Sequence, residues 1–134
     1  MSRAEPIWIE AQDALALHER LLALHGGASG ARGEGVLRSA LSRPRNMFAD
    51  EDRADLIGLA SALTSGVVKN HPFVDGEKRT GFVVGILFLE LNGYVFTASE
   101  TAAAEAVLAL AAGGLDEVGY GAFLRENAKA GAVL

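Results

Sequence analysis

The chain of 134 residues has no cysteine, only three prolines and few aromatic side chains. Without cysteine it can form neither disulfides nor thiolate metal sites, which suits the cytoplasm. Acidic residues outnumber basic ones, and the net charge of −5 supplies no basic surface for direct nucleic-acid binding. The longest apolar run, AAAEAVLALAAGG, contains Glu105 and is shorter than the ~20 residues of a membrane span. The start, MSRAEPIWIE, lacks the apolar core of a signal peptide. We therefore expect a cytoplasmic protein with no membrane contact.

Half of the residues are apolar, which is enough to form a core in one domain covering residues 1–134. Apolar residues recur at helical spacing, and the expected helices cover about 11–25, 36–43, 52–69, 79–91, 98–112 and 117–129. The third and fourth are the most apolar, so we expect them at the centre of the fold. No repeat, charge block or linker divides the chain.

Local signals set the expected helix ends. Gly26-Gly27 ends the first helix, Pro44 the second, and Pro72 ends the third near Asn70 or His71. Thr97 and Glu100 have the spacing of a capping box before the alanine-rich helix, which stops at Gly113-Gly114, and Asp116 caps the last helix. Residues 7–9 and 94–96 are predicted to be extended and to pair. The expected fold is all-α, with at most a small two-stranded ribbon.

Charge gathers in one decapeptide, HPFVDGEKRT at residues 71–80, between the two central helices. Its end is the start of the second central helix, where unpaired amides and the helix dipole attract anions. Gly76 allows a phosphate to approach the backbone, and Lys78 and Arg79 add positive charge. Asp75 could bind magnesium, and His71 could act as a general base.

Together these groups indicate phosphoryl or nucleotidyl transfer, in which positioning and charge stabilisation do most of the catalysis. A structural interpretation is also open on spacing alone. Asp-Gly is a common turn dipeptide, and lysine and arginine at a helix start are usually solvated.

The decapeptide resembles the signature of the Fic/Doc family, His-x-Phe-x-Asp/Glu-Gly-Asn-Gly/Lys-Arg. With lysine at position 78, the decapeptide resembles the Doc (death on curing) branch of this family, which contains the toxins of toxin–antitoxin modules. The stretches HGGASGARGEGVLRSALSRP at 25–44 and FLELNGYVFTAS at 88–99 also resemble Doc proteins, so the similarity covers most of the chain. In that family the residue corresponding to Phe73 anchors the loop in the core.

The resemblance implies an all-helical Fic/Doc-like domain that uses ATP and Mg²⁺. Fic proteins typically transfer AMP to a hydroxyl, whereas Doc toxins transfer the γ-phosphate to a threonine of elongation factor Tu and stop translation. By position the catalytic residues would be His71 as base, Asp75 as metal ligand, and Lys78 and Arg79 as charge stabilisers. The nucleotide-binding residues would be Lys69, Gly76, Glu77, Lys78 and Arg79. The chain lacks the family's internal inhibitory pattern, so a Phd-type antitoxin is the expected partner.

Two positions depart from the family pattern. Phe82 occupies the place of the second arginine of AMP-transferring enzymes, which argues against AMP transfer. Glu77 replaces the asparagine, and an ionised carboxylate ~4 Å from a phosphate costs about 1 kcal/mol in water and about 4 kcal/mol at a dielectric constant of 20. Glu77 could bind a second metal, pair with Lys78 or Arg79, or indicate that the loop no longer uses ATP in the usual way.

Several functions stay open at this point. They are a Doc-like kinase toxin, a catalytically weakened Fic-fold binding module, a protein adenylyltransferase, and a metal-dependent phosphohydrolase using His71, Asp75 and Glu77. His18 and His25 are seven residues apart, a poor spacing for metal ligands on a helix, and are expected to be packing or surface residues. GARGEG at 30–35 matches no nucleotide-binding pattern and is expected to be a mobile loop over the pocket.

Overall fold

The computed structural model describes residues 5–28, 34–50, 54–70 and 76–131. Within these ranges the chain forms α1 (Ala11–His25), α2 (Glu34–Asp50), α3 (Leu56–Asn70), α4 (Glu77–Leu91), β1 (Tyr94–Phe96), α5 (Glu100–Ala112), α6 (Glu117–Asn127) and β2 (Ala128–Ala130). The prediction of an all-α fold with one small ribbon is confirmed. In the part of the chain described, no helix combines the length and the apolar character needed to cross a bilayer.

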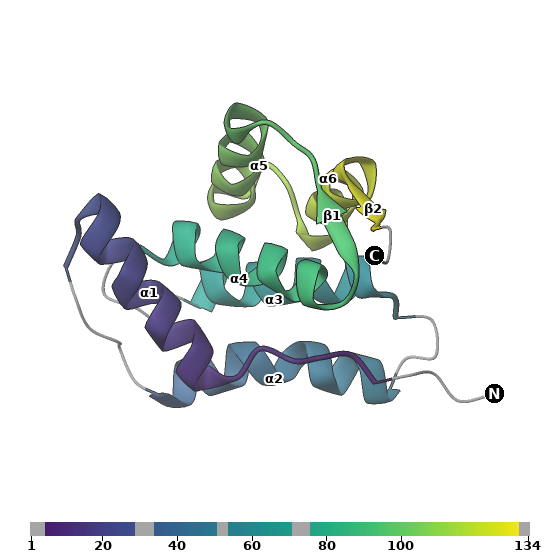
Figure 1. Ribbon diagram of the computed structural model, residues 1–134, viewed down its shortest axis with the longest axis horizontal. Coiled ribbons are helices and arrows are strands. Elements are labelled where there is room, and N and C mark those ends of the chain that lie inside the picture. Colours follow the sequence, from purple (N-terminus) through teal and green to yellow (C-terminus); the bar gives the residue numbers. More distant parts are fainter. Residues whose placement is uncertain (1–4, 29–33, 51–53, 71–75, 132–134) are drawn as a thin grey trace.

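The helices form three layers (Figure 1). The pair α3 and α4 lies in the middle, α2 packs on one side, α5 and α6 lie on the other, and α1 crosses one end of α4. Every residue of α3 from Leu59 to Val68 is buried, because other helices cover it on all sides. The two most apolar helices of the sequence are thus the central ones, as predicted.

Two glycines let α4 approach α3 closely. A Cβ atom at Gly85 would lie 2.2 Å from the Thr64 hydroxyl, and one at Gly81 would lie 2.9 Å from a methyl group of Val68. The Thr64 hydroxyl donates a hydrogen bond of 2.8 Å to the Gly81 carbonyl. This hydrogen bond and the close packing fix the position of α4 along α3, and therefore the position at which α4 begins.

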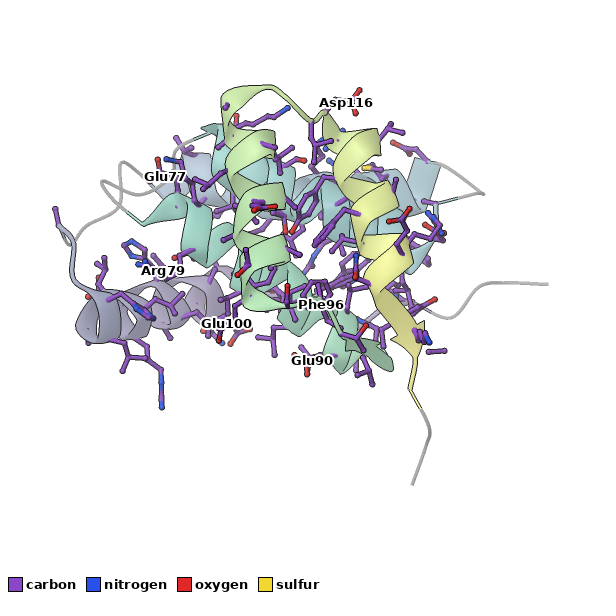
Figure 2. All side chains as sticks on the ribbon, turned by 90° about the horizontal axis from the view of Figure 1, so that it is seen from above. Glu77, Arg79, Glu90, Phe96, Glu100 and Asp116 are labelled. Atoms are coloured by element: carbon purple, nitrogen blue, oxygen red, sulfur yellow. The ribbon has the colours of Figure 1, made fainter. Side chains whose placement is uncertain are left out.

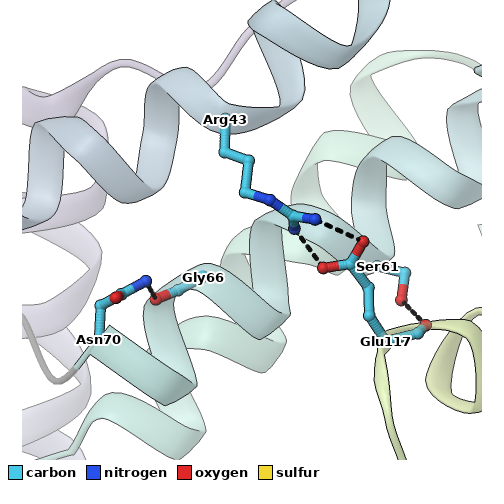
Figure 3. Close-up of polar contacts among 5 residues, drawn as sticks. All are labelled: Arg43, Ser61, Gly66, Asn70 and Glu117. Carbon is cyan, nitrogen blue, oxygen red and sulfur yellow. Dashed lines mark hydrogen bonds and ion pairs between the residues drawn. The ribbon is translucent and has the colours of Figure 1, made fainter. Parts of the chain in front are cut away.

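Polar contacts join the layers at the edges of α3 (Figure 3). Arg43 of α2 forms a two-point ion pair with Glu117 of α6, and the Ser61 hydroxyl of α3 donates to the Glu117 carbonyl at 2.6 Å. At the far end of α3, the Asn70 side-chain amide donates to the Gly66 carbonyl at 2.8 Å. This bond lies within the last turn of α3, just before the charged decapeptide.

Most helix ends fall where local signals predict them. The first helix ends at His25 before Gly26, α3 ends at Asn70, and α5 ends before Gly113, which has a left-handed conformation. The Asp116 carboxylate caps α6 by accepting a hydrogen bond from the Gly119 amide at 2.7 Å. These ends depend on backbone chemistry within one turn, which explains why they are visible in the sequence.

The prediction that Pro44 ends the second helix is wrong, because α2 continues through it to Asp50. Pro44 itself is buried. Beyond it, the ring of Phe48 packs edge-on against Trp8 with ring centroids 5.8 Å apart. Tertiary packing after the proline therefore outweighs the missing backbone hydrogen bond.

The ribbon has a different partner from the one predicted. Strand β1 pairs antiparallel with β2, with Tyr94 opposite Ala130 and Phe96 opposite Ala128, so the last helix stops before Lys129. The extended residues 7–9 instead reach the Asn92 side chain, which accepts from the Ile7 amide at 2.8 Å and donates to the Ile7 carbonyl at 2.9 Å.

The predicted cap of the alanine-rich helix is also wrong. The side chain of Ser99, and not that of Thr97, caps α5 by accepting from the Ala102 amide at 3.1 Å. Thr97 uses both its amide and its hydroxyl to donate to the Asn127 carbonyl, at 2.8 and 3.1 Å. It therefore ties the end of β1 to the end of α6.

Candidate functional site

The start of α4 is built on a glycine that no other residue replaces without strain. Gly76 has φ 81° and ψ 12°, the left-handed conformation, and precedes the first helical residue, Glu77. Residues other than glycine pay about 1–2 kcal/mol for this conformation. The Gly76 carbonyl accepts the first helical hydrogen bond, from the Thr80 amide at 3.0 Å. The amides of the first turn therefore have no partner within the helix.

Three charged side chains follow on this first turn. Lys78 and Arg79 are exposed, whereas Glu77 is half-buried. Seen from above in Figure 2, Glu77 and Arg79 lie at the same end of the molecule, where α4 begins. The positive end of the helix dipole and two cations thus share one place, which favours an anion, and one carboxylate opposes them.

A groove of about 630 Å³ leads away from this charged end, between α4 and α5. Its lining residues come from α4 and the glycine before it, from the end of β1 and the segment that joins β1 to α5, and from one face of α5: Gly76, Glu77, Lys78, Arg79, Phe82, Ile86, Phe96, Ala98, Ser99, Glu100, Ala103, Ala104, Val107 and Leu108. The polar groups therefore gather near helix starts, and the remaining wall is apolar.

Aromatic rings form the floor of the groove. Phe82 of α4 packs edge-on against Phe96 of β1, with ring centroids 5.7 Å apart, and Phe96 packs in the same way against Phe123 of α6 at 6.0 Å. On the labelled view, Phe96 and Glu100 lie farther along α4 than Arg79 does (Figure 2). The groove can therefore accept a ligand with an anionic end at the α4 start and an apolar part along the helices.

The predicted site residues have different outcomes. Gly76, Glu77, Lys78 and Arg79 come together at one end of the groove. Lys69 is exposed on the last turn of α3 and does not line the groove. The predicted base and metal ligand, His71 and Asp75, lie outside the described residues, as does Phe73.

Other sequence features are placed only in part. Of the predicted mobile loop at 30–35, residues 30–33 lie outside the described ranges, and Glu34 and Gly35 begin α2. His18 is buried and His25 is exposed. The described ranges contain no group of three or more histidine, aspartate or glutamate side chains that could hold a metal ion.

The apolar half of the groove was not predicted from the sequence. Phe82 and Ile86 are one turn apart on α4, and with Arg79 they mark a single face of that helix. That spacing was visible, but α4 carries apolar residues nearly all round. Spacing alone could not distinguish the face that packs on α3 from the face that stays accessible.

Comparisons with known proteins point to one family. The model of the Fic/DOC family matches residues 8–89, which include α1 to α3, most of α4 and the charged decapeptide. The chain is 30% identical over 95 residues to "Protein kinase doc" of Escherichia phage P1, covering 70% of this chain and 75% of that relative. It is 35% identical over 69 residues to "Toxin Doc" of Mycolicibacterium smegmatis, covering 51% of this chain and 53% of that relative.

Proposed function

The chain belongs to the Fic/Doc family, and on that basis we propose that it is a Doc-like toxin of a toxin–antitoxin module. Its reaction is the transfer of a phosphoryl group from ATP to a threonine or serine hydroxyl of a translation factor, such as elongation factor Tu. The observation that carries this proposal is the start of α4. There a left-handed glycine, the N-terminus of a helix and two exposed cations adjoin one groove.

The reaction requires charge stabilisation more than covalent chemistry. The target hydroxyl oxygen attacks the γ-phosphorus, the bond from that phosphorus to the β–γ bridging oxygen breaks, and ADP leaves. His71 takes the hydroxyl proton. Lys78 and Arg79, with the first amides of α4, would stabilise the negative charge on the phosphate oxygens and the departing ADP. Gly76 lets the phosphates approach the backbone because it has no side chain.

Magnesium fits this arrangement as a partner of the nucleotide. Mg²⁺ in phosphoryl-transfer sites is usually held by one or two carboxylates and by substrate phosphates. The lack of a three-residue metal cluster among the described residues is therefore compatible with a Mg²⁺–ATP complex. Asp75 is the proposed protein ligand, and the ion would neutralise charge on the β- and γ-phosphates.

Transfer of AMP is the less favoured reaction. The adenylylating branch of the family uses a second arginine at the position of Phe82, and here that ring packs against Phe96 on the groove floor. This position therefore supplies no positive charge for an α-phosphate. Lys78 stands where that branch has glycine, which also agrees with γ-phosphate transfer.

A catalytically weak binding module is the second candidate, and Glu77 favours it. This half-buried carboxylate lines the same end of the groove as Lys78 and Arg79. It lowers the attraction for a triphosphate and, unlike asparagine, cannot donate a hydrogen bond when ionised. In this alternative the protein would act by binding a partner or a nucleotide without transfer.

Labelled ATP separates these functions. The protein is incubated with a cell lysate and with γ-labelled or α-labelled ATP in parallel, with Arg79→Ala as the inactive control. Label from the γ-position on a protein supports the kinase, and α-label supports adenylylation. Free phosphate alone supports hydrolysis, and no label or phosphate release supports the binding module.

Toxicity in cells tests the biological half of the proposal. Overexpression should arrest growth, and co-expression of a Phd-type antitoxin should relieve the arrest. His71→Ala should abolish the arrest and leave the melting temperature nearly unchanged. Arrest by this variant would exclude His71 as the base, and the absence of arrest by the parent chain would contradict the toxin. We propose that the protein acts in the cytoplasm, where translation factors are found.

A further inference from the structure

One face of α1 carries a histidine where apolar side chains would suffice for packing. Ala14, His18 and Leu22 are four residues apart and are the buried residues of this helix. His18 is 1% exposed, although His25, two turns later on the same helix, is exposed. A buried imidazole carries two ring nitrogens that require polar partners. Packing against α4 alone therefore does not account for a histidine at this position.

The ring of His18 lies against the glycine that opens α4. A Cβ atom built on Gly76 would be 3.6 Å from Nε2 of His18 and 3.7 Å from its Cδ2, with Leu22 at 3.4 Å. The other ring nitrogen, Nδ1, lies 4.0 Å from a carboxylate oxygen of Glu19. The Nε2 edge of the imidazole thus faces the start of α4, and the Nδ1 side lies toward Glu19, which is exposed.

We infer that His18 is a positioning residue for the anion-binding end of α4. The buried ring forms the wall against which Gly76 rests. That wall sets the direction in which the amides of the first turn point. The expected effect of His18 on nucleotide binding rests on the proposed use of ATP. Its effect on the start of α4 does not, because that effect exists without ligand.

The first test compares His18→Leu with His18→Gln. Leucine retains apolar packing but has no polar atom, whereas glutamine retains a donor and an acceptor. We expect His18→Leu to bind Mg²⁺–ATP about tenfold more weakly by calorimetry, which is the effect of one misplaced hydrogen-bond donor. His18→Gln should restore part of the affinity. Equal affinity of the parent chain and His18→Leu would overturn the inference.

The second test needs no nucleotide. Hydrogen exchange reports on the Thr80 amide, which donates the first hydrogen bond of α4 to Gly76, and on the Asn92 amide, which closes its last turn on Phe88 and Leu89. We expect exchange in His18→Leu to be about tenfold faster at Thr80 and unchanged at Asn92. A purely structural role would speed exchange at both ends, and that result would contradict the inference.

Leu124→Ala is the matched control for stability. Leu124 is 1% exposed on α6, which packs on α3 and α5, so this variant should lower the melting temperature without changing Mg²⁺–ATP affinity. A parent chain that binds no Mg²⁺–ATP would refute the proposed function, and the exchange experiment would still decide the role of His18. If His18→Leu does not fold, the flexible apolar side chain of His18→Met takes its place, and unchanged exchange at Thr80 in that variant overturns the inference.

Discussion

Two faces of α4 differ sharply in how much space they leave. The face on α3 carries Gly81 and Gly85, and a single added methyl group at either position would overlap a neighbouring side chain. The face on α5 carries Arg79, Phe82 and Ile86, which line a groove of about 630 Å³. The two faces belong to the same four turns of one helix.

The difference shows how the fold can hold a binding site on a helix without deforming it. The closed face fixes the height and rotation of α4, so the amides at its start keep their direction. The open face leaves the charged first turn accessible. We therefore expect substitutions on the closed face to change stability, and substitutions on the open face to change ligand binding and activity.

Arg79→Ala should have the largest effect, and only on activity. Removing a positioned cation from a developing phosphate charge typically costs about 100-fold or more in rate. Because Arg79 is exposed, the melting temperature should stay within about 2 °C of the parent chain. The measurement is the transfer of γ-label to protein, with Arg20→Ala on α1 as a control for loss of one positive charge. Normal transfer by Arg79→Ala would remove this residue from the site.

Gly85→Ala tests the closed face. Its methyl group would lie 2.2 Å from the Thr64 hydroxyl, which is buried and already bonded to the Gly81 carbonyl. Overpacking of this kind costs about 1–3 kcal/mol, or roughly 5–15 °C in melting temperature. Gly35→Ala is the matched control, because a Cβ atom there meets nothing within 4 Å. Equal melting temperatures of the two variants would show that the α3–α4 contact can relax.

Features set by one turn of backbone were predictable from the sequence. Asp116 and Gly113 mark helix ends by local chemistry, and the structure has those ends there, while α3 ends at Asn70, as predicted from Pro72. The charged first turn of α4 was predictable for the same reason, since Gly76, Lys78 and Arg79 are consecutive or nearly so. Their common location requires only that a helix begins there.

Features that depend on distant contacts were not predictable. Pro44 lies inside α2 because Phe48, beyond it, packs on Trp8. Strand β2 has the sequence Ala-Lys-Ala, which has low strand propensity, and it is extended because it pairs with β1. The groove has the same origin, because its apolar wall combines α4 with a face of α5 that the sequence does not relate to it.

Glu77→Asn tests the carboxylate that lies beside Lys78 and Arg79 on the open face. Removing the carboxylate that lies beside the two cations should strengthen Mg²⁺–ATP binding by about fivefold or more, from the Coulomb energy of about 1 kcal/mol at ~4 Å in water. Calorimetry measures the affinity. Glu77→Gln separates charge from shape, because it also removes the charge but retains the longer side chain. If neither variant binds ATP more tightly than the parent chain, Glu77 does not repel the nucleotide.

The smallest effect is expected at an ion pair away from both faces. Asp55 precedes α3, accepts from the Gly58 amide at 2.8 Å and pairs with Arg125 of α6 at 2.8 Å. Burial raises the pKa of Asp55, but the hydrogen bonds from Arg125 and Gly58 outweigh it, so the pKa lies below its ordinary value of 3.8. Ionised Asp55 therefore stabilises the folded state at pH values above its ordinary pKa, and this stabilisation is lost as the pH falls through the lowered pKa of the folded state.

Asp55→Asn removes the charge and keeps a good helix cap. Because both partners are half-exposed, we expect a loss of only about 0.2–1 kcal/mol at neutral pH. Chemical denaturation between about pH 6 and about pH 3 should show this difference from the parent chain shrinking on acidification. A difference that stays constant or grows toward acid would mean that the pair does not lower the pKa of Asp55. Phosphoryl transfer should be unchanged, since neither partner lines the groove.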